Sequence, residues 1–243
     1  MKTLLVLGAS SDIANATARR YASEGYDLIL AGRDVEELAR TASDIHIRLN
    51  VRTWAVSFDA RAISTHGSFY ESLPAKPDGV VCAIGYLGNQ SAAESDLDET
   101  QKVIETNFTG CVTILNIVAN DFERRKAGFI VVLSSVAGDR GRRSNYLYGS
   151  SKAGLTAYLS GLRSRLSNAN VQVLTVKPGF VATRMTEGMN LPPLLTATPE
   201  AAARDIVRAQ KKGKNAVYTR WFWRWIMLII RSIPEFLFKK MPL

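Results

Sequence analysis

The chain has 243 residues, of which 47% are hydrophobic and 22% are charged, and its formal net charge is +9. This composition supplies a packed core and suits one large α/β domain, which excludes an intrinsically disordered protein. Nine of the 31 basic residues and one of the 22 acidic residues lie from residue 208 onward, which leaves 22 basic and 21 acidic residues before it. A body with balanced charge argues against nucleic-acid binding, and the basic end favours an anionic surface as its partner.

Short apolar segments alternate with amphipathic ones along the chain. The apolar segments, each typical of a buried strand, cover residues 3–8, 27–32, 52–58, 79–85, 128–134, 171–178 and 215–219. Segments with helical periodicity lie between them, at residues 13–24, 34–48, 62–73, 99–126, 147–168 and 199–212. Strands that are apolar on both faces are typical of a parallel sheet with helices on both sides. The sequence therefore predicts a Rossmann-like, doubly wound α/β fold of about seven strands, as a single domain over residues 1–219.

The start of the chain and its two cysteines bear on location. The opening "MKTLLVLGAS" has too short an apolar run for a signal peptide, and we expect it to form the first strand. Cys82 and Cys111 lie in apolar segments without the spacing of zinc ligands, so we expect reduced core thiols and no metal site. Together these features predict a cytoplasmic protein.

The first predicted strand ends in "LGASSDIANA", residues 7–16, which runs from a strand into a helix. A glycine turn at this point lets backbone N–H groups and the helix N-terminus meet the pyrophosphate of a dinucleotide. The segment lacks the spacing G-x-G-x-x-G. An ordinary strand–helix turn, capped by Ser11 or Asp12, therefore stays open as the alternative.

The second predicted strand ends in "ILAGRD", where Arg33 follows Gly32. An acidic residue at this place would accept hydrogen bonds from the ribose hydroxyls of NAD, whereas an arginine suits the 2′-phosphate of NADP. Arg33 therefore favours NADP. NAD is the alternative because Asp34 follows directly, and a solvated loop arginine would look the same in the sequence.

The stretch "NYLYGSSKAGL", residues 145–155, combines two tyrosines with one lysine at a predicted helix start. At about 100° per residue, Tyr148 and Lys152 lie on one helix face, while Tyr146 points away from Lys152. Tyr148 is thus the candidate partner of the lysine, and Tyr146 is a packing or pocket-wall residue. Such a pair is weak evidence by itself, because it also occurs on solvated helix faces.

These segments together resemble the short-chain dehydrogenase/reductase family, over residues 1 to about 215. The matches to the family's motifs are Gly8 in its glycine-rich turn, Gly85 after its fourth strand, its ordered set Asn107, Ser135, Tyr148 and Lys152, and its P-G-x-V-x-T at Pro178, Gly179, Val181 and Thr183. The glycine-rich turn departs from the family pattern, since Asp12 and Ala14 stand where the family has glycines. This departure leaves the phosphate contacts in question, with Asp12 an awkward neighbour for a pyrophosphate.

The resemblance implies an NAD(P)H-dependent carbonyl reductase or alcohol dehydrogenase. A ketone that accepts a hydride develops alkoxide character, so its oxygen needs a proton donor and hydrogen-bond support. Tyr148 would give this proton in reduction and take it back in oxidation, while the Lys152 cation stabilises the phenolate. In the family pattern Lys152 also holds the nicotinamide ribose, Ser135 orients the carbonyl, and Asn107 holds a water of a proton relay.

The resemblance also implies the residues that hold the coenzyme. Asp59 matches the family's adenine-contacting aspartate, and Thr183 matches its carboxamide-binding threonine. The full predicted set is Gly8, Ser10, Ser11, Asp12, Ile13, Arg33, Asp59, Ala83, Gly85, Tyr148, Lys152, Pro178, Gly179, Val181 and Thr183. A dinucleotide-binding sensor without turnover is the alternative, which the missing glycines favour and the complete Asn–Ser–Tyr–Lys set opposes.

Between Ser135 and Tyr148, the segment "AGDRGRRSN" brings Arg140, Arg142 and Arg143 to the loop beside the catalytic pair. Arginines grip a phosphate through charge-assisted hydrogen bonds, so these three are candidate substrate ligands. A solvated basic turn is the alternative.

The last segment, residues 220–243, is basic and rich in tryptophan, and we call it the tail. Its apolar run is too short to span a bilayer, and on a helix Arg220, Arg224 and Arg231 fall within one stripe. This pattern is typical of a helix that lies on an anionic membrane, which would make the protein peripheral on the inner membrane face. A lid or a subunit contact in a homodimer or homotetramer is the alternative.

The arginine loop, the end of the tail and "GYLG" at residues 85–88 resemble the decaprenylphosphoryl-2-ketoribose reductases. This resemblance implies a lipid-linked substrate, a keto-sugar on a polyprenyl phosphate. A 3-oxoacyl thioester or a small ketone is the alternative substrate.

Overall fold

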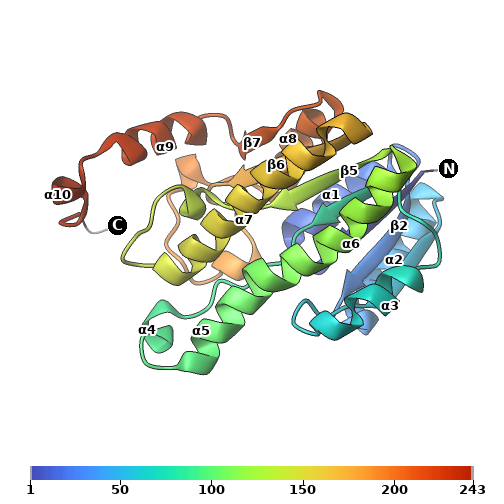
Figure 1. Ribbon diagram of the computed structural model, residues 1–243, viewed down its shortest axis with the longest axis horizontal. Helices are drawn as coiled ribbons and strands as arrows, with labels where there is room; N and C mark the ends of the chain where they lie inside the picture. The colour runs from blue at the N-terminus through green and yellow to red at the C-terminus, as the bar shows by residue number, and fades with distance from the viewer. Residues whose placement is uncertain (1, 242–243) are drawn as a thin grey trace.

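A computed structural model describes residues 2–241 (Figure 1). Seven parallel strands form one sheet in the order β3-β2-β1-β4-β5-β6-β7. They are β1 (Thr3–Leu7), β2 (Asp27–Gly32), β3 (Thr53–Ser57), β4 (Gly79–Cys82), β5 (Gly128–Leu133), β6 (Val171–Pro178) and β7 (Ala216–Thr219). Every segment predicted as a strand belongs to this sheet, so the predicted Rossmann-like fold is confirmed.

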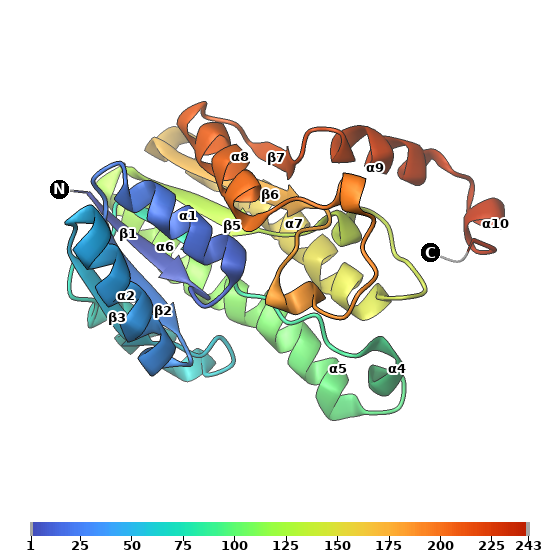
Figure 2. The same cartoon turned by 180° about the vertical axis from the view of Figure 1, so that it is seen from behind.

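Helices cover both faces of the sheet (Figures 1 and 2). One face carries α1 (Asp12–Ala22), α2 (Val35–Leu49) and α8 (Pro199–Lys211), and the other carries α3 (His66–Glu71), α6 (Gly110–Arg125) and α7 (Tyr146–Leu166). Alternate residues of β1 enter different cores: Leu4 packs on the first face and Leu5 on the second. This two-sided burial explains why the strands read as continuous apolar runs.

The segment predicted as one helix over residues 99–126 is interrupted. α5 (Leu97–Ile104) and α6 are joined by a π-helical turn over Glu105–Thr109, and the short helix α4 (Gln90–Ala93) precedes them. α6 begins against the loop after β3. A Cβ at Gly110 would lie 2.2 Å from the Ala60 oxygen of that loop, so a residue without a side chain is needed there. The turn places the side chain of Asn107 in the interior, fully buried.

The two cysteines lie in the core between the sheet and α6. Cys82 ends β4 and Cys111 begins α6, and both thiols are buried and free, as predicted. A hydrogen bond to Cys82 and burial raise the pKa of the Cys111 thiol. A thiol in this environment stays protonated and chemically inert.

The tail is not one continuous helix, on which Arg220, Arg224 and Arg231 would form a stripe. It forms α9 (Trp223–Ser232) and α10 (Glu235–Phe238), with a break at Ile233 because Pro234 disfavours helical backbone at the residue before it. Arg220 precedes α9 with a φ of 61°, so the predicted arginine stripe keeps only Arg224 and Arg231. Residues 242–243 of the predicted tail lie outside the described residues.

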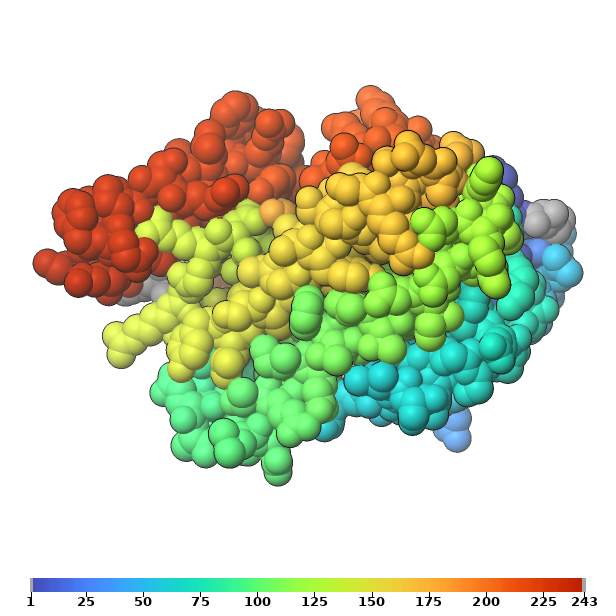
Figure 3. All heavy atoms as spheres, in the orientation of Figure 1, coloured from blue at the N-terminus to red at the C-terminus, as the bar shows by residue number. Residues whose placement is uncertain are grey.

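The tail packs on the body through one face of α9. Trp223 and Met227, four residues apart, are 3% and 0% exposed. A Cβ at Gly179 would lie 2.0 Å from the Trp223 indole, which rests directly on the loop after β6. Figure 3 shows the tail against the loop that leads from β5 to α7. Among the described residues, no helix is both long and apolar enough to cross a bilayer.

Candidate active site

The predicted site residues gather at the carboxyl ends of the central strands. β1 lies between β2 and β4, so the strand order reverses there and the turns after β1 and β4 face each other. Gly8 has a φ of +75°, and a Cβ at this residue would lie 2.9 Å from the Ile84 nitrogen. Only glycine fits both constraints, which leaves an open backbone turn at the start of α1.

Lys152 forms the floor of the site. Its side chain is 2% exposed, and Nζ donates to the carbonyl oxygens of Leu133 at 3.1 Å and Ile84 at 3.2 Å. Leu133 ends β5 and Ile84 lies two residues after β4, so the carboxyl ends of two neighbouring strands fix the ammonium group. An ammonium group has three N–H donors, which leaves one for a ligand.

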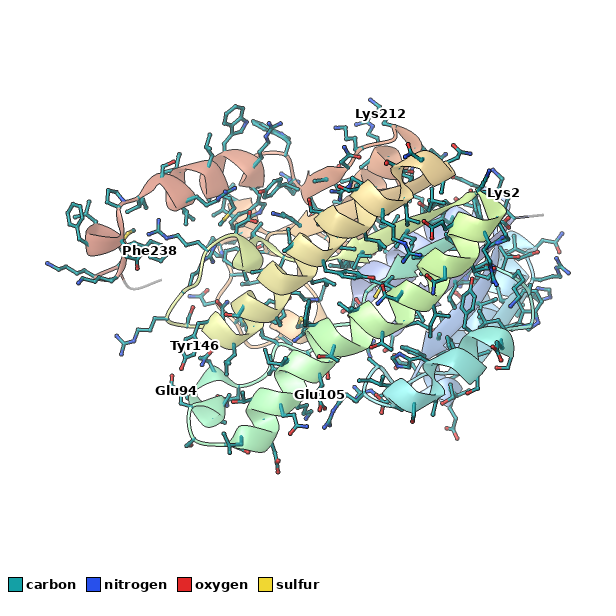
Figure 4. The ribbon with its side chains drawn as sticks, viewed as in Figure 1. Lys2, Glu94, Glu105, Tyr146, Lys212 and Phe238 are labelled. Carbon is teal, nitrogen blue, oxygen red and sulfur yellow. The ribbon has the colours of Figure 1, made fainter. Side chains whose placement is uncertain are left out.

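The two tyrosines of the α7 start point to different neighbours. The Tyr148 ring lies with its centroid 5.8 Å from Lys152 Nζ. The Tyr146 hydroxyl instead donates to the Glu94 carboxylate at 3.4 Å, and both residues are labelled where α7 approaches α4 in Figure 4. The helical spacing predicted this division between the two phenols.

Asn107 and Ser135 complete the predicted catalytic set. The Asn107 amide oxygen accepts from the Tyr86 nitrogen at 2.9 Å, and its Nδ2 donates to the Tyr86 oxygen at 2.7 Å. A Cβ at Gly85 would lie 3.7 Å from both Asn107 Oδ1 and Lys152 Nζ, so these residues are neighbours. Ser135 follows β5, and its hydroxyl oxygen accepts from the Ala137 nitrogen at 3.1 Å. Both side chains thus also have structural contacts within the fold.

Arg184 is a residue that the sequence did not single out. Its backbone nitrogen donates to the Asp12 carboxylate at 2.7 Å, and its Nη1 pairs with Glu37 at 2.9 Å. Its Nη2 also donates to the Ser10 carbonyl. Asp12 is therefore turned toward a cation, and neither its carboxylate nor the Ser11 hydroxyl caps α1. The one signal was its position directly after Thr183 in the P-G-x-V-x-T motif.

Arg33 and Asp34, the residues after β2 that favoured NADP and NAD respectively, have different contacts. Asp34 Oδ1 accepts from the Glu37 nitrogen at 2.9 Å and so caps α2. Arg33 is exposed and makes no hydrogen bond or ion pair within residues 2–241. Asp34 is therefore engaged as the N-cap of α2, whereas the Arg33 side chain is available to bind a ligand.

The other predicted coenzyme residues lie around the same edge. Asp59 is exposed after β3 and accepts from the Arg61 nitrogen at 2.9 Å. Ala83 follows β4, Pro178 ends β6, and Ile13 is buried in α1. Val181 and Thr183 lie on the loop after β6, with Val181 paired to Ala197. A cleft of about 1060 Å³ between α1 and this loop is lined by Ser10, Asp12, Thr183 and Arg184, and the four catalytic candidates lie outside it.

The three loop arginines have different surroundings. Arg140 Nη1 donates to the carbonyl oxygens of Ile230 at 2.6 Å and Ile233 at 2.5 Å, and its guanidinium lies 3.7 Å from the centre of the Phe238 ring. Arg140 therefore holds the tail, an engagement that the prediction of a substrate ligand did not anticipate. Arg142 is half-buried and Arg143 is exposed.

The comparisons with known proteins agree with this geometry. A family profile described as short chain dehydrogenase matches residues 2–192. The chain belongs to the short-chain dehydrogenase family. An uncharacterised oxidoreductase of Mycobacterium tuberculosis is 38% identical to this short-chain dehydrogenase over 242 residues, which cover 98% of this chain and 96% of the relative.

Solved structures share the fold of this family member. A short-chain dehydrogenase from Sphingobium yanoikuyae in complex with NADPH superposes with a TM-score of 0.84 at 21% identity, covering 97% of each chain. An actinorhodin polyketide ketoreductase variant with NADPH gives a TM-score of 0.81 at 22% identity, covering 91% of this chain and 97% of that one. These structures show that the chain has the architecture of solved short-chain dehydrogenases.

Proposed function

We propose that the protein is an NADPH-dependent carbonyl reductase in which Tyr148 is the proton donor. The observation that carries this proposal is the buried Lys152 ammonium, fixed by two strand-end carbonyls, 5.8 Å from the centre of the Tyr148 ring. A cation beside a phenol stabilises the phenolate that remains after the proton has moved to the substrate oxygen. Bound NADPH supplies the hydride.

Ser135 is suited to hold the carbonyl oxygen. Its hydroxyl oxygen accepts a hydrogen bond from the Ala137 nitrogen, so the hydroxyl proton stays available to donate. A second donor at the substrate oxygen strengthens as negative charge develops there. Asn107 acts by fixing the loop after β4 through its two bonds to Tyr86.

The residues at the coenzyme side fit a dinucleotide with a 2′-phosphate. The N–H groups of Gly8, Ala9 and Ser11 donate to backbone carbonyls, so a pyrophosphate at this turn would be held by the first N–H groups of α1, which have no partner within the helix. Arg33 is free to pair with the 2′-phosphate, while Asp34 is engaged as a helix cap. The Sphingobium relative contains NADPH, which supports the same coenzyme here. NAD is the alternative.

A direct assay tests the reductase. Purified protein should oxidise NADPH when given small ketones such as diacetyl, followed by the absorbance of the reduced nicotinamide. Binding of NADPH without oxidation across a panel of ketones, keto-sugar lipids and 3-oxoacyl thioesters would favour the sensor instead. The same panel tests the lipid-linked keto-sugar, which rests on the sequence resemblance, against the alternative substrates.

We also propose that the tail rests on an anionic membrane, on the cytoplasmic side. At about 100° per residue, the face of α9 opposite its buried face carries Trp225, Leu228 and Ile229, and these are 55%, 54% and 67% exposed. Arg224 and Arg231, seven residues apart, lie together along one edge of this apolar face, as a basic edge does in an interfacial helix. Basic residues near an anionic leaflet contribute about 1 kcal/mol each.

Sedimentation with vesicles tests the tail. The full chain should pellet with anionic liposomes and less with neutral ones, and salt should remove only the electrostatic difference between the two. Truncation after Tyr218 should release it. A chain that ignores liposomes, and whose truncation breaks a homodimer or homotetramer, would make the tail a subunit contact.

A further inference from the structure

The three arginines of the loop between β5 and α7 differ in how their charges are satisfied. Arg140 is engaged by the tail, with its charge paired to Glu235 at 2.8 Å. Arg143 is exposed to solvent, which satisfies its charge without a partner. Arg142 is half-buried, so neither explanation covers it.

The Arg142 guanidinium has no anionic partner within residues 2–241. Its Nε is buried without a hydrogen bond, and its Nη2 contacts only the sulfur of Met227, at 3.5 Å. The nearby Asp139 is already bound by Lys177 and by the Tyr218 hydroxyl. Burial lowers the pKa of Arg142, since desolvation outweighs the attraction of Asp139. A half-buried guanidinium with a desolvated, unpaired Nε is costly, and an anion would offset part of that cost.

Two other unpaired polar atoms belong to Asn145, directly before α7, and to Gln90, the first residue of α4. Asn145 Oδ1 and Gln90 Nε2 are buried without hydrogen-bond partners. Asn145 is joined to Arg142 by a turn, its nitrogen donating to the Arg142 oxygen at 3.1 Å. Gln90 is joined to α7 because its Oε1 accepts from the Leu147 nitrogen at 3.0 Å. Two donors and one acceptor therefore lie unpaired on segments adjoining the turn of α7 that carries Tyr148.

We propose that Arg142, Asn145 and Gln90 form a polar substrate subsite, in which Arg142 binds an anionic group of the ketone. The substrate class is a ketone that carries a phosphate ester or a carboxylate, with hydroxyl groups suited to the amides of Gln90 and Asn145. This subsite rests on the proposed function, because the carbonyl of the same molecule must reach Tyr148. The contact of Arg142 with Met227 brings the anion beside α9, at the junction of loop and tail.

Matched pairs of ketones test this subsite. Dihydroxyacetone phosphate is compared with dihydroxyacetone, and levulinate with 2-pentanone, by kcat/KM with NADPH. We expect the charged member of at least one pair to be preferred by roughly 10- to 100-fold, the range for a hydrogen bond to a charged group. Preference in the first pair identifies a phosphate ester and preference in the second a carboxylate. Equal kcat/KM values in both pairs would overturn the proposal.

Variants assign the preference to Arg142. Arg142→Met should reduce the ratio of kcat/KM for the charged ketone to kcat/KM for its uncharged partner to about one. Arg142→Lys should restore part of the preference. Arg143→Met removes the same charge from the same loop and should keep the ratio. A preference that survives Arg142→Met, or is lost equally in Arg143→Met, would sink the assignment.

A binding measurement separates this site from the reductase activity. With the coenzyme site saturated by NADP⁺, inorganic phosphate, compared with chloride at equal ionic strength, should raise the melting temperature of the wild type and of Arg143→Met but not of Arg142→Met. If no ketone is reduced and this pattern holds, the anion site stands and the reductase proposal fails. If ketones are reduced and phosphate acts equally on all variants, the reductase stands and the anion site fails.

Discussion

Polar side chains are hydrogen-bonded on the floor of the candidate site, formed by Lys152 and Asn107, and unpaired at its rim, the segment from Arg142 to Asn145 before α7. On the floor, Lys152 and Asn107 are 2% and 0% exposed, and backbone carbonyls accept their hydrogen bonds. On the rim, Arg142 and Asn145 keep buried atoms unpaired. A satisfied floor is preorganised before any ligand arrives, whereas an unsatisfied rim gains free energy only when a ligand pairs with it. The floor therefore suits chemistry common to many ketones, and the rim suits the choice of one.

The largest expected effect breaks the floor. Tyr148→Phe removes the proposed proton donor while leaving the ring beside Lys152, so kcat for ketone reduction should fall by about 10²- to 10⁴-fold. NADPH binding, measured by fluorescence titration, should persist because the hydroxyl is not needed to hold the coenzyme. Tyr146→Phe is the matched control and should keep most activity, since its hydroxyl contacts Glu94. Comparable losses in both variants would contradict the choice of tyrosine.

The next largest effect concerns the coenzyme side of the candidate site, where Arg33 follows β2. Arg33→Ala should weaken NADPH binding by ~1.5–3 kcal/mol, the range for hydrogen bonds to charged groups. NADH binding should barely change, because NADH has no 2′-phosphate. Titration of both coenzymes measures the difference. A wild-type enzyme that prefers NADH at equal concentration would contradict the role of Arg33.

A smaller effect tests how the rim is assembled. Arg140→Met removes the hydrogen bonds to the Ile230 and Ile233 carbonyls, which should loosen the tail by about 1–2 kcal/mol. Limited proteolysis should then cleave the tail faster than in the wild type. Glu235→Gln is the control, and because Glu235 is 77% exposed its effect should stay below about 0.5 kcal/mol. Unchanged proteolysis in Arg140→Met would show that Trp223 and Met227 hold the tail alone.

The smallest effect concerns Asp12 and Arg184 at the edge of the floor. Arg184→Met leaves the Asp12 carboxylate without its cation, next to the turn proposed for the pyrophosphate. Because Arg184 is 57% exposed, NADPH binding should weaken by only about 0.5–1 kcal/mol, and salt should reduce the loss. The double variant with Asp12→Asn should recover affinity, since it removes the unpaired acid. Failure to recover would mean that Arg184 contacts the coenzyme itself.

The sequence by itself determined the sheet, its helical layers and the candidate catalytic set. Apolar runs and helical periods are local properties and can be recognised without knowledge of the fold. Every strand predicted from them belongs to the sheet. The four-residue spacing from Tyr148 to Lys152 is also local, and it predicted which phenol lies beside the ammonium group. The pattern could not predict that Lys152 is buried, because its burial depends on the carbonyls of Leu133 in β5 and of Ile84 after β4.

Only the tertiary structure decided the roles of the arginines and the path of the tail. Arg140 bonds to residues 90 to 95 positions away, and Arg184 to Asp12 across 172 positions. No local pattern records such partners, so Arg140, Arg142 and Arg143 looked equivalent in one basic loop. A guanidinium is the same chemical group in all three, and its role depends on whether the fold brings it a carbonyl, a thioether or water.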